Sequence, residues 1–164
     1  MGIFDIFKKS KQEESKGIVS PTNGELLEIT KVPDEVFSTK MMGDGFAIKS
    51  TDGIIVSPVD GKVGVIFETK HAVIIESKEG KEVLIHLGID TVNLKGEGFE
   101  VFVNVGDEVK AGDKLVKMDL PFIEANAKSS ISPVIFTNLE SNESIKVVEG
   151  PVKAFESGRV EIVK

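Results

Sequence analysis

The stretch "HAVIIESKEGKEVLIHLG", residues 71–88, decides the fold, because two apolar runs flank a short turn that contains glycine. Runs rich in Val and Ile on either side of such a turn predict a β-hairpin. Each run carries one of the only two histidines in the 164-residue chain, His71 in the first and His86 in the second. The hairpin is therefore also the first candidate for a functional site.

The length of the hairpin turn decides whether the two histidines share a face of the sheet, because side chains alternate between faces along a strand. A turn of two or four residues would place His71 and His86 on one face, directly opposite or one diagonal step apart. A three-residue turn would place them on opposite faces. We predict the first arrangement, with the two imidazoles close together.

The rest of the chain from Gly17 onward resembles the hairpin in composition. Short runs of Val, Ile and Phe alternate with turns rich in Gly, Asp and Asn, at a spacing of roughly ten residues, which is typical of a sandwich or barrel. Only residues 33–40 and 120–130 offer helical material, and Pro121 suits a first helical turn. We therefore predict one all-β domain over residues 17–164, an antiparallel β-sandwich or barrel with short helical turns.

An internal repeat supports a fold built from related units. "VSPTNGELLEI" (19–29) and "VSPVDGKVGVI" (56–66) share Val, Ser, Pro, Gly and Ile at matching positions, and "ISPVIF" (131–136) echoes the start of both. Repeats of this kind predict strand–turn–strand units that pack against one another.

Residues 1–16 differ in composition from the rest. Ile3, Phe4, Ile6 and Phe7 have helical spacing, and three lysines follow within a polar segment. The segment is interpreted as a flexible tail or as a short amphipathic helix with a linker. In the second case we predict a weak contact with anionic lipid, which would make the protein peripheral to the inner face of the cell membrane.

Composition excludes several functional classes. The formal net charge is −7 and the chain has no cysteine. An acidic chain without a basic, aromatic cluster is a poor candidate for a nucleic-acid binder, and the lack of cysteine excludes disulfides and thiol nucleophiles. No apolar run reaches the length of a membrane span, and the start lacks the features of a secretory signal. These features favour a cytoplasmic protein.

The paired histidines admit three chemistries: metal binding, general base catalysis, or nucleophilic attack by one imidazole with the other assisting. Hydrolytic zinc sites need at least three protein ligands, and the hairpin offers two histidines with at most Glu76 or Asp90 nearby. No GxSxG motif supports a serine nucleophile. A nucleophilic histidine remains, and its reactive bond to phosphorus suits the onward transfer of a phosphoryl group.

The residues around His86 resemble the active-site signature of a known protein family. "GKEVLIHLGIDTV" (80–92) is similar to the active-site signature of the IIA component (EIIA) of the glucose-type bacterial phosphoenolpyruvate-dependent sugar phosphotransferase system, in its free-standing, single-domain form. Further blocks carry the resemblance: "MGIFD", "VPDEVF", "MGDGFAIK", "SPVDGKVGVIFETKHA", "HLGIDTVNLKGEGF" and "DLPFIEANAKS". The resemblance implies a β-sandwich known as the duplicated hybrid motif, and an EIIA phosphocarrier domain over residues 17–164.

The resemblance also implies roles for individual residues. His86 falls on the phosphoacceptor, which uses Nε2, and we expect its Nδ1–H to be held by a backbone carbonyl such as that of Gly88. His71 falls on the second active-site histidine and would stabilise the phosphoryl group. Thr69 would orient His71. HPr would donate the phosphoryl group, and the IIB domain of a IIBC sugar permease would receive it, without a cofactor.

The partner surface is likewise implied by the resemblance. An apolar rim and two acidic positions are predicted, at Val36, Phe37, Met41, Met42, Phe67 and Val92, and at Asp34 and Asp90. The acidic pair would attract arginines of HPr and IIB. His71 and His86 could also hold zinc at a partner interface if the partner supplied a carboxylate, although the isolated chain should bind zinc weakly.

Two other classes compete with a phosphocarrier. "SPVDGKVGVI" and "VNVGDEVKAGDKLVKM" also resemble a biotinyl or lipoyl carrier domain, but Lys117 lies in an apolar run rather than at a hairpin tip. The third class is a purely regulatory module, because relatives in some bacteria bind transporters and metabolic enzymes when unphosphorylated. The sequence does not separate a carrier from a carrier that also regulates.

Overall fold

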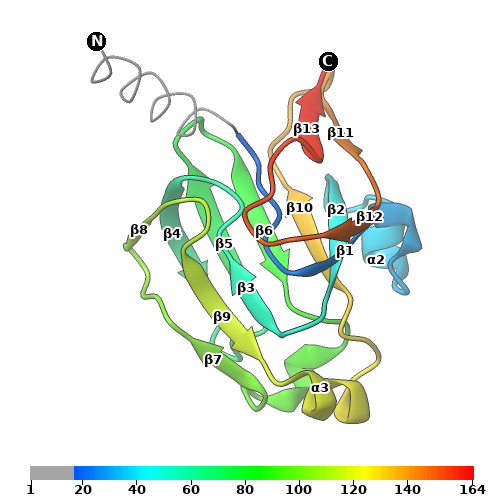
Figure 1. Cartoon of the computed structure of the whole chain (residues 1–164), viewed down its shortest axis with the longest axis vertical. Helices are drawn as coiled ribbons and strands as arrows, with labels where there is room; N and C mark the ends of the chain where they lie inside the picture. Colours follow the sequence, from blue (N-terminus) through cyan, green and yellow to red (C-terminus); the bar gives the residue numbers. More distant parts are fainter. Residues whose placement is uncertain (1–16) are drawn as a thin grey trace.

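A computed structural model describes residues 17–164, and the predictions for residues 1–16 lie outside this part of the chain. The larger of two packed layers is an eight-stranded sheet in which every pairing is antiparallel (Figure 1). In spatial order its strands are β12 (Gly150–Val152), β1 (Gly24–Glu28), β2 (Asp44–Ser50), β10 (Ser132–Phe136), β6 (Glu82–His86), β5 (Ala72–Ser77), β4 (Gly61–Ile66) and β8 (Glu108–Val109).

The second layer is the sheet of β3 (Ile54–Val56), β9 (Lys114–Met118) and β7 (Phe99–Val101), which lies in front of β4, β5 and β6 in Figure 1. The pair β11 (Ser144–Val147) and β13 (Val160–Val163) lies at the upper end of the molecule in the same view. The helices and helical turns are η1 (Ile29–Lys31), α2 (Glu35–Ser38), η2 (Thr91–Leu94) and α3 (Leu120–Asn126). The predicted all-β sandwich with short helical turns is confirmed.

The main core fills the space between the two layers. Alternate residues of the central strands, among them Phe46, Val73, Ile85 and Val134, point into it and are almost fully buried. A smaller apolar cluster covers the outer face of the large sheet, where Phe37 packs with Ala72 and Leu84. This second cluster matters for function, because it lies beneath the histidines.

The repeat found in the sequence is a structural duplication. The large sheet consists of two four-stranded halves that meet where β10 pairs with β6. From its outer edge inward, one half runs β12, β1, β2, β10 and the other runs β8, β4, β5, β6, so the hairpin β1–β2 corresponds to the hairpin β4–β5. Ser20 Oγ donates to the Thr22 carbonyl, and Ser57 Oγ donates to the Val59 carbonyl in the same way. The predicted duplicated organisation is therefore confirmed.

Each copy of the repeat contains a glycine at a position where no side chain fits. A Cβ on Gly24 would lie 2.0 Å from the carbonyl oxygen of Lys49, and one on Gly61 would lie 2.2 Å from that of Glu76. At each position the paired strand approaches too closely for any residue except glycine.

The predicted register of the histidine hairpin is wrong. Ala72 pairs with His86, and the backbone of Ser77 pairs with that of Lys81, which leaves a three-residue turn at 78–80. Regular alternation in this register would place the two histidines on opposite faces of the sheet. Their rings nevertheless lie 5.2 Å apart between centroids, because His71 precedes β5 and belongs to the turn before it. The predicted proximity of the imidazoles is therefore right, although the register behind it is not.

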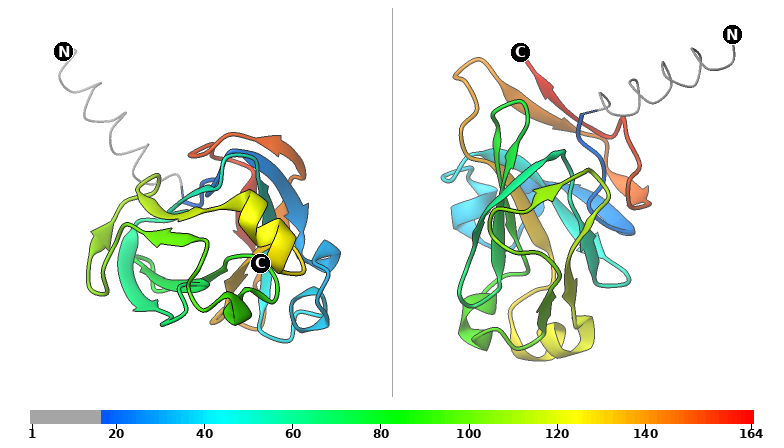
Figure 2. Two further views of the ribbon diagram at one scale, coloured as in Figure 1. Left: turned by 90° about the horizontal axis from the view of Figure 1, so that it is seen from below. Right: turned by 90° about the vertical axis from the view of Figure 1, so that its left-hand side faces the viewer.

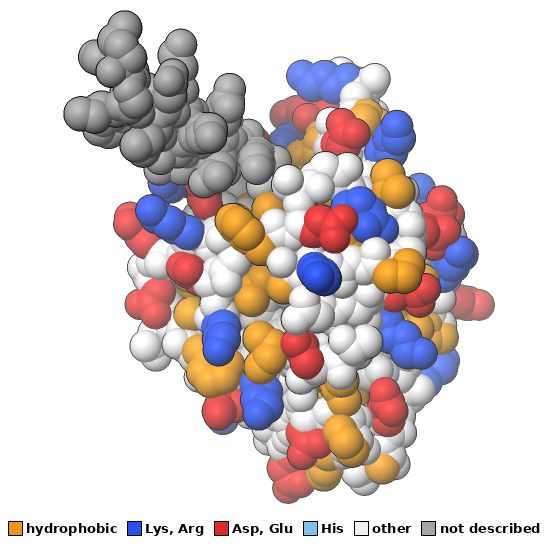
Figure 3. Space-filling view, in the orientation of Figure 1, with side chains coloured by type: hydrophobic (Ala, Val, Ile, Leu, Met, Phe, Trp, Pro, Cys, Tyr) orange, Lys and Arg blue, Asp and Glu red, His pale blue; other side chains and the backbone are white. Residues whose placement is uncertain are grey.

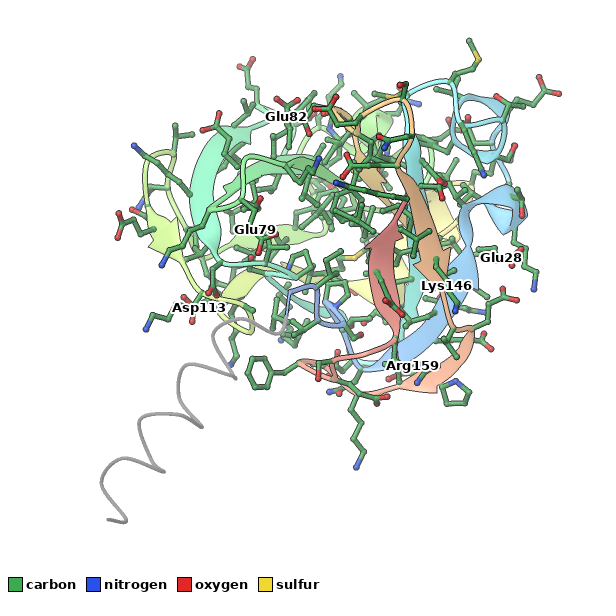
Figure 4. All side chains as sticks on the ribbon, turned by 90° about the horizontal axis from the view of Figure 1, so that it is seen from above. Glu28, Glu79, Glu82, Asp113, Lys146 and Arg159 are labelled. Atoms are coloured by element: carbon green, nitrogen blue, oxygen red, sulfur yellow. The ribbon has the colours of Figure 1, made fainter. Side chains whose placement is uncertain are left out.

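The histidines occupy the end of the hairpin farthest from its turn. Figure 4 looks onto the turn end, where Glu79 and Glu82 are labelled. Seen from the other end (Figure 2, left), α3 lies nearest the viewer, with η2 and α2 beside it. The face in Figure 3 mixes charges of both signs with small apolar patches and exposes no histidine of residues 17–164. The strand pairing places the site: His86 lies opposite Ala72, which belongs to the apolar cluster on the outer face of the large sheet.

No helix within residues 17–164 is long and apolar enough to cross a membrane.

Candidate functional site

His86 is the last residue of β6 and projects to the outer face of the large sheet. Its ring packs against that of Phe37, with centroids 4.8 Å apart. The predicted hydrogen bond is present: Nδ1 lies 2.8 Å from the carbonyl oxygen of Gly88. Because a carbonyl only accepts, Nδ1 carries the proton, and Nε2 of the neutral ring keeps its lone pair. The contact thus selects the nitrogen that can act as a nucleophile.

Only glycine can occupy position 88. Its φ is +78°, and a Cβ there would lie 2.7 Å from Thr91 Cγ2 and 2.8 Å from the carbonyl oxygen of Ser129. This conformation directs the Gly88 carbonyl back toward His86.

Two further hydrogen bonds fix the peptide units around Gly88. The Gly88 N–H donates to Ser132 Oγ at 3.0 Å, and the Ile89 N–H donates to the Ser129 carbonyl at 2.8 Å. Because the Ile89 N–H and the Gly88 C=O belong to one peptide plane, holding the first also orients the second toward His86. The imidazole of His86 is therefore oriented by Ser129, just before β10, and by Ser132, the first residue of that strand.

His71 approaches His86 from the turn before β5. It is only 7% exposed, and its Nδ1 lies 2.5 Å from Thr69 Oγ1, as expected for a residue that orients the ring. The ring of Phe67 lies edge-on at a centroid distance of 5.3 Å. A hydroxyl can donate or accept, so this contact permits either tautomer of His71.

The surroundings favour the neutral form of both imidazoles. Burial lowers the pKa of His71, and the neighbouring His86 lowers it further. Burial also lowers the pKa of His86, although the Gly88 carbonyl and the negative charges of Asp34 and Asp90 act in the opposite direction. A neutral ring is the form that a nucleophilic nitrogen requires.

Several predicted rim residues meet around the histidines in a shallow depression of about 250 Å³. Its lining consists of Asp34, Val36, Phe37, His71, His86, Asp90, Thr91 and Val92. Val36 and Val92 are exposed to 43% and 48%, so apolar surface is presented beside the imidazoles. Asp34 also caps α2 by accepting the N–H of Val36, and Asp90 adopts a left-handed conformation after Gly88.

Three predicted partner residues, Met41, Met42 and Phe67, are absent from the lining of this depression, and a fourth, Phe37, lies beneath it. Met41 and Met42 lie in the turn after α2, exposed to 76% and 41%, and are absent from the lining. Phe37 differs from the prediction, since it is only 6% exposed and fills the outer-face cluster under His86. It supports the imidazole from below and offers a partner little contact area.

Sequence reasoning missed the residues that brace the Gly88 turn. Ser129 and Ser132 lie more than forty positions after Gly88, and nothing local in "SSISPV" marks their partner. Thr91 belongs to the motif, but only the structure shows what it does there, since its hydroxyl donates to the Leu87 carbonyl inside the turn. A signal for Ser132 did exist in the repeated Ser-Pro pair.

Metal ligands are sparse in the part of the chain that the structure describes. No cluster of three or more His, Cys, Asp or Glu side chains there could hold an ion. His71 and His86 supply two ligands, so the prediction of zinc at a partner interface stays a prediction.

The fold and the site define a class of protein: a duplicated β-sandwich that presents two histidines side by side in an open surface depression. Residues 16–142 match the family model of the phosphoenolpyruvate-dependent sugar phosphotransferase system, EIIA 1. The chain belongs to this family and is a phosphocarrier of the sugar phosphotransferase system.

Individual relatives agree with the family assignment. The chain is 47% identical over 162 residues to the PTS system glucose-specific EIIA component of Bacillus cereus, covering 99% of this chain and 95% of that protein. It is 48% identical over 145 residues to the protein of the same name from Staphylococcus aureus, covering 88% and 87%. The solved glucose permease IIA from Mycoplasma capricolum superposes with a TM-score of 0.82 at 42% identity, covering 87% and 93%.

Proposed function

We propose that His86 accepts a phosphoryl group from phospho-HPr through Nε2 and passes it to the IIB domain of a sugar permease. One observation carries the proposal: the Gly88 carbonyl binds the proton on Nδ1 and so leaves Nε2 as the free base. The imidazole is held in this orientation before any partner arrives, and such positioning is the main requirement of phosphoryl transfer.

The transfer balances without a further reactant. The Nε2 lone pair of His86 forms a bond to phosphorus as the nitrogen–phosphorus bond on the donor histidine of HPr breaks. The donor ring leaves with the electron pair of the broken bond. Transfer to IIB repeats this exchange with His86 as the leaving group, so neither nucleotide nor metal takes part in our proposal.

His71 stabilises the phosphoryl oxygens in this scheme. When the Thr69 hydroxyl donates to Nδ1, the proton of neutral His71 sits on Nε2 and can donate to an oxygen of the transferring group. The ring lies 5.2 Å from His86 between centroids, close enough for both to touch one phosphoryl group. Pre-oriented donors of this kind lower the barrier, because they need no reorganisation as charge develops.

The shape and charge of the site fit two successive protein partners. The depression is open to solvent, and its apolar rim at Val36 and Val92 can be covered by a protein surface. Asp34 and Asp90 beside it attract cationic side chains on the partner. Docking then brings the two reacting imidazoles together.

The test is phosphorylation of the His86→Ala variant by phospho-HPr, followed by intact mass. The wild type should gain one phosphate, about 80 Da, and His86→Ala should gain none while its melting temperature stays close to that of the wild type. The matched control is His71→Ala, which keeps the nucleophile and should still reach full phosphorylation slowly. Normal phosphorylation of His86→Ala would end the proposal.

A second ligand is proposed only for a complex. Zinc could bridge His71, His86 and a carboxylate on a partner that docks over the depression. Isothermal titration of zinc into the protein alone should give weak binding, because two ligands leave the coordination shell incomplete. Sub-micromolar affinity that His71→Ala removes would instead show a complete site within this chain.

A further inference from the structure

The position of His71 poses a geometric problem. The hydrogen bond from the Leu87 N–H to the His71 carbonyl, 2.7 Å long, continues the pairing of β5 with β6 by one residue. Leu87 points into the main core, and so does Val73, two residues after His71. Continued alternation would direct His71 into that core as well. Its ring instead lies beside His86 on the opposite, outer face.

The turn before β5 resolves the conflict. The Lys70 N–H donates to the Phe67 carbonyl at 2.8 Å, and the Phe67 N–H donates to the Ala72 carbonyl at 3.0 Å. Between these bonds Lys70 has φ +59°, in the left-handed region. A left-handed residue ends the extended geometry, so the side chain that follows no longer obeys the alternation of the strand.

Lysine is a costly choice at such a position. Its Cβ crowds the backbone in the left-handed region, where glycine, asparagine and aspartate are the residues usually found. Lys70 is exposed, and its stem passes close to Gly96. Strained backbone persists where the surrounding structure enforces it, and such positions cluster at functional sites.

We propose that the left-handed backbone of Lys70 is a positioning element, which turns His71 out of the β5 alternation and sets its imidazole against His86. Lys70 acts through His71 and touches neither reacting atom. The backbone conformation matters in this account, and the ammonium group does not. The consequence for transfer rests on the proposed function, whereas the consequence for the His71 ring does not.

The experiment is a substitution series that separates backbone from charge. Lys70→Met keeps the conformational cost and removes the charge, whereas Lys70→Gly removes the cost and the side chain together. Lys70→Val introduces a β-branched residue that resists the left-handed region. Lys40→Val is the matched control, because Lys40 also has a left-handed backbone, φ +63°, but lies outside the histidine turn.

The first readout is the His71 ring in the unphosphorylated protein, observed by NMR. In Lys70→Val the His71 pKa should rise toward its ordinary value, because the ring leaves its buried place beside His86. Lys70→Gly, Lys70→Met and Lys40→Val should retain the wild-type pKa. An unchanged His71 in Lys70→Val would overturn the proposal, and this measurement stands whether or not His86 accepts phosphate.

The second readout is the rate of phosphoryl exchange with phospho-HPr. Lys70→Val should slow it by about tenfold or more, since small misplacements of a positioned group are costly. Lys70→Gly and Lys70→Met should match the wild type, and equal losses in all three would assign the effect to the ammonium group instead. In a His71→Ala background, Lys70→Val should change the rate by less than about twofold, because its effect passes through His71.

Discussion

The two halves of the large sheet contain equivalent hairpins, β1–β2 and β4–β5, whose connecting segments differ in length and content. In the first half, β1 and β2 are joined by residues 29–43, which contain α2 and the exposed Met41 and Met42. In the second half, β4 and β5 are joined by only residues 67–71, which carry Thr69 and His71. The long connection offers adaptable apolar surface, whereas the short one fixes a single imidazole.

In the proposed function, this difference would let one duplicated scaffold supply docking surface from one connection and chemistry from the other. A short connection leaves the backbone few conformations, so it can hold a ring within the tolerance that phosphoryl transfer requires. A long connection with methionine and valine at its surface can adjust to two partners of different shape. Changes in the short connection and the Gly88 turn should therefore alter rates, and changes in the long connection should alter affinities.

The largest effect is expected at the Gly88 turn, where Gly88→Ala should abolish phosphate uptake. The added Cβ meets Thr91 and the Ser129 carbonyl below 3.0 Å at φ +78°, so the carbonyl that orients His86 must move. The matched control is Gly80→Ala, because Gly80 has φ +87° but nothing within 4 Å of the new Cβ. The control should lose about 1–2 kcal/mol of stability and keep its uptake rate. Equal uptake in the two variants would refute the role of the Gly88 carbonyl.

The next effect concerns the short connection. His71→Ala should slow phosphoryl exchange by roughly a hundredfold, the loss typical of removing one pre-oriented donor. His71→Gln, which retains an N–H donor, should lose less in at least one of the two half-reactions. Rapid-quench measurements of both directions provide the check. Wild-type rates for His71→Ala would reduce His71 to a packing residue.

The long connection should give a smaller effect of a different kind. Val36→Ala should raise the KM for HPr by about three- to tenfold with little change in kcat, because it removes apolar contact area from the rim. Val148→Ala is the matched control, since Val148 is exposed to 49%, against 43% for Val36, and lies outside the depression. A fall in kcat alone for Val36→Ala would contradict the division between docking and chemistry.

The smallest expected effect is on how the stability of the folded protein depends on pH. The pKa of both histidines is lowered in the folded protein, so the unfolded chain binds more protons below the ordinary value near 6.5. The contribution of the two histidines to the free energy of unfolding is therefore fully present above about pH 6.5. It is lost as the pH falls through their pKa values in the folded protein. Urea unfolding at a series of pH values should show this loss, reduced in His71→Gln. Stability that rises as pH falls from 7 to 6 would have the wrong sign.

The sequence predicted the parts of this molecule that follow from local pattern. The all-β class and the repeat could be inferred from strand–turn alternation, and the Gly88 contact was expected from the motif around His86. The register of the hairpin could not be inferred from the sequence. The length of the turn is set by backbone hydrogen bonds at Lys78 and Gly80 rather than by the apolar pattern. Ser132 was missed because only the folded sheet brings it to Gly88.

The central claim is that the Gly88 carbonyl makes Nε2 of His86 the nucleophile. The most direct test is NMR of ¹⁵N-imidazole-labelled protein after phosphorylation by phospho-HPr, which locates the phosphorus by its coupling to one ring nitrogen. The account predicts a single product with phosphorus on Nε2 of His86, and with Nδ1 still protonated and hydrogen-bonded. Phosphorus on Nδ1 of His86, or on either nitrogen of His71, would contradict it.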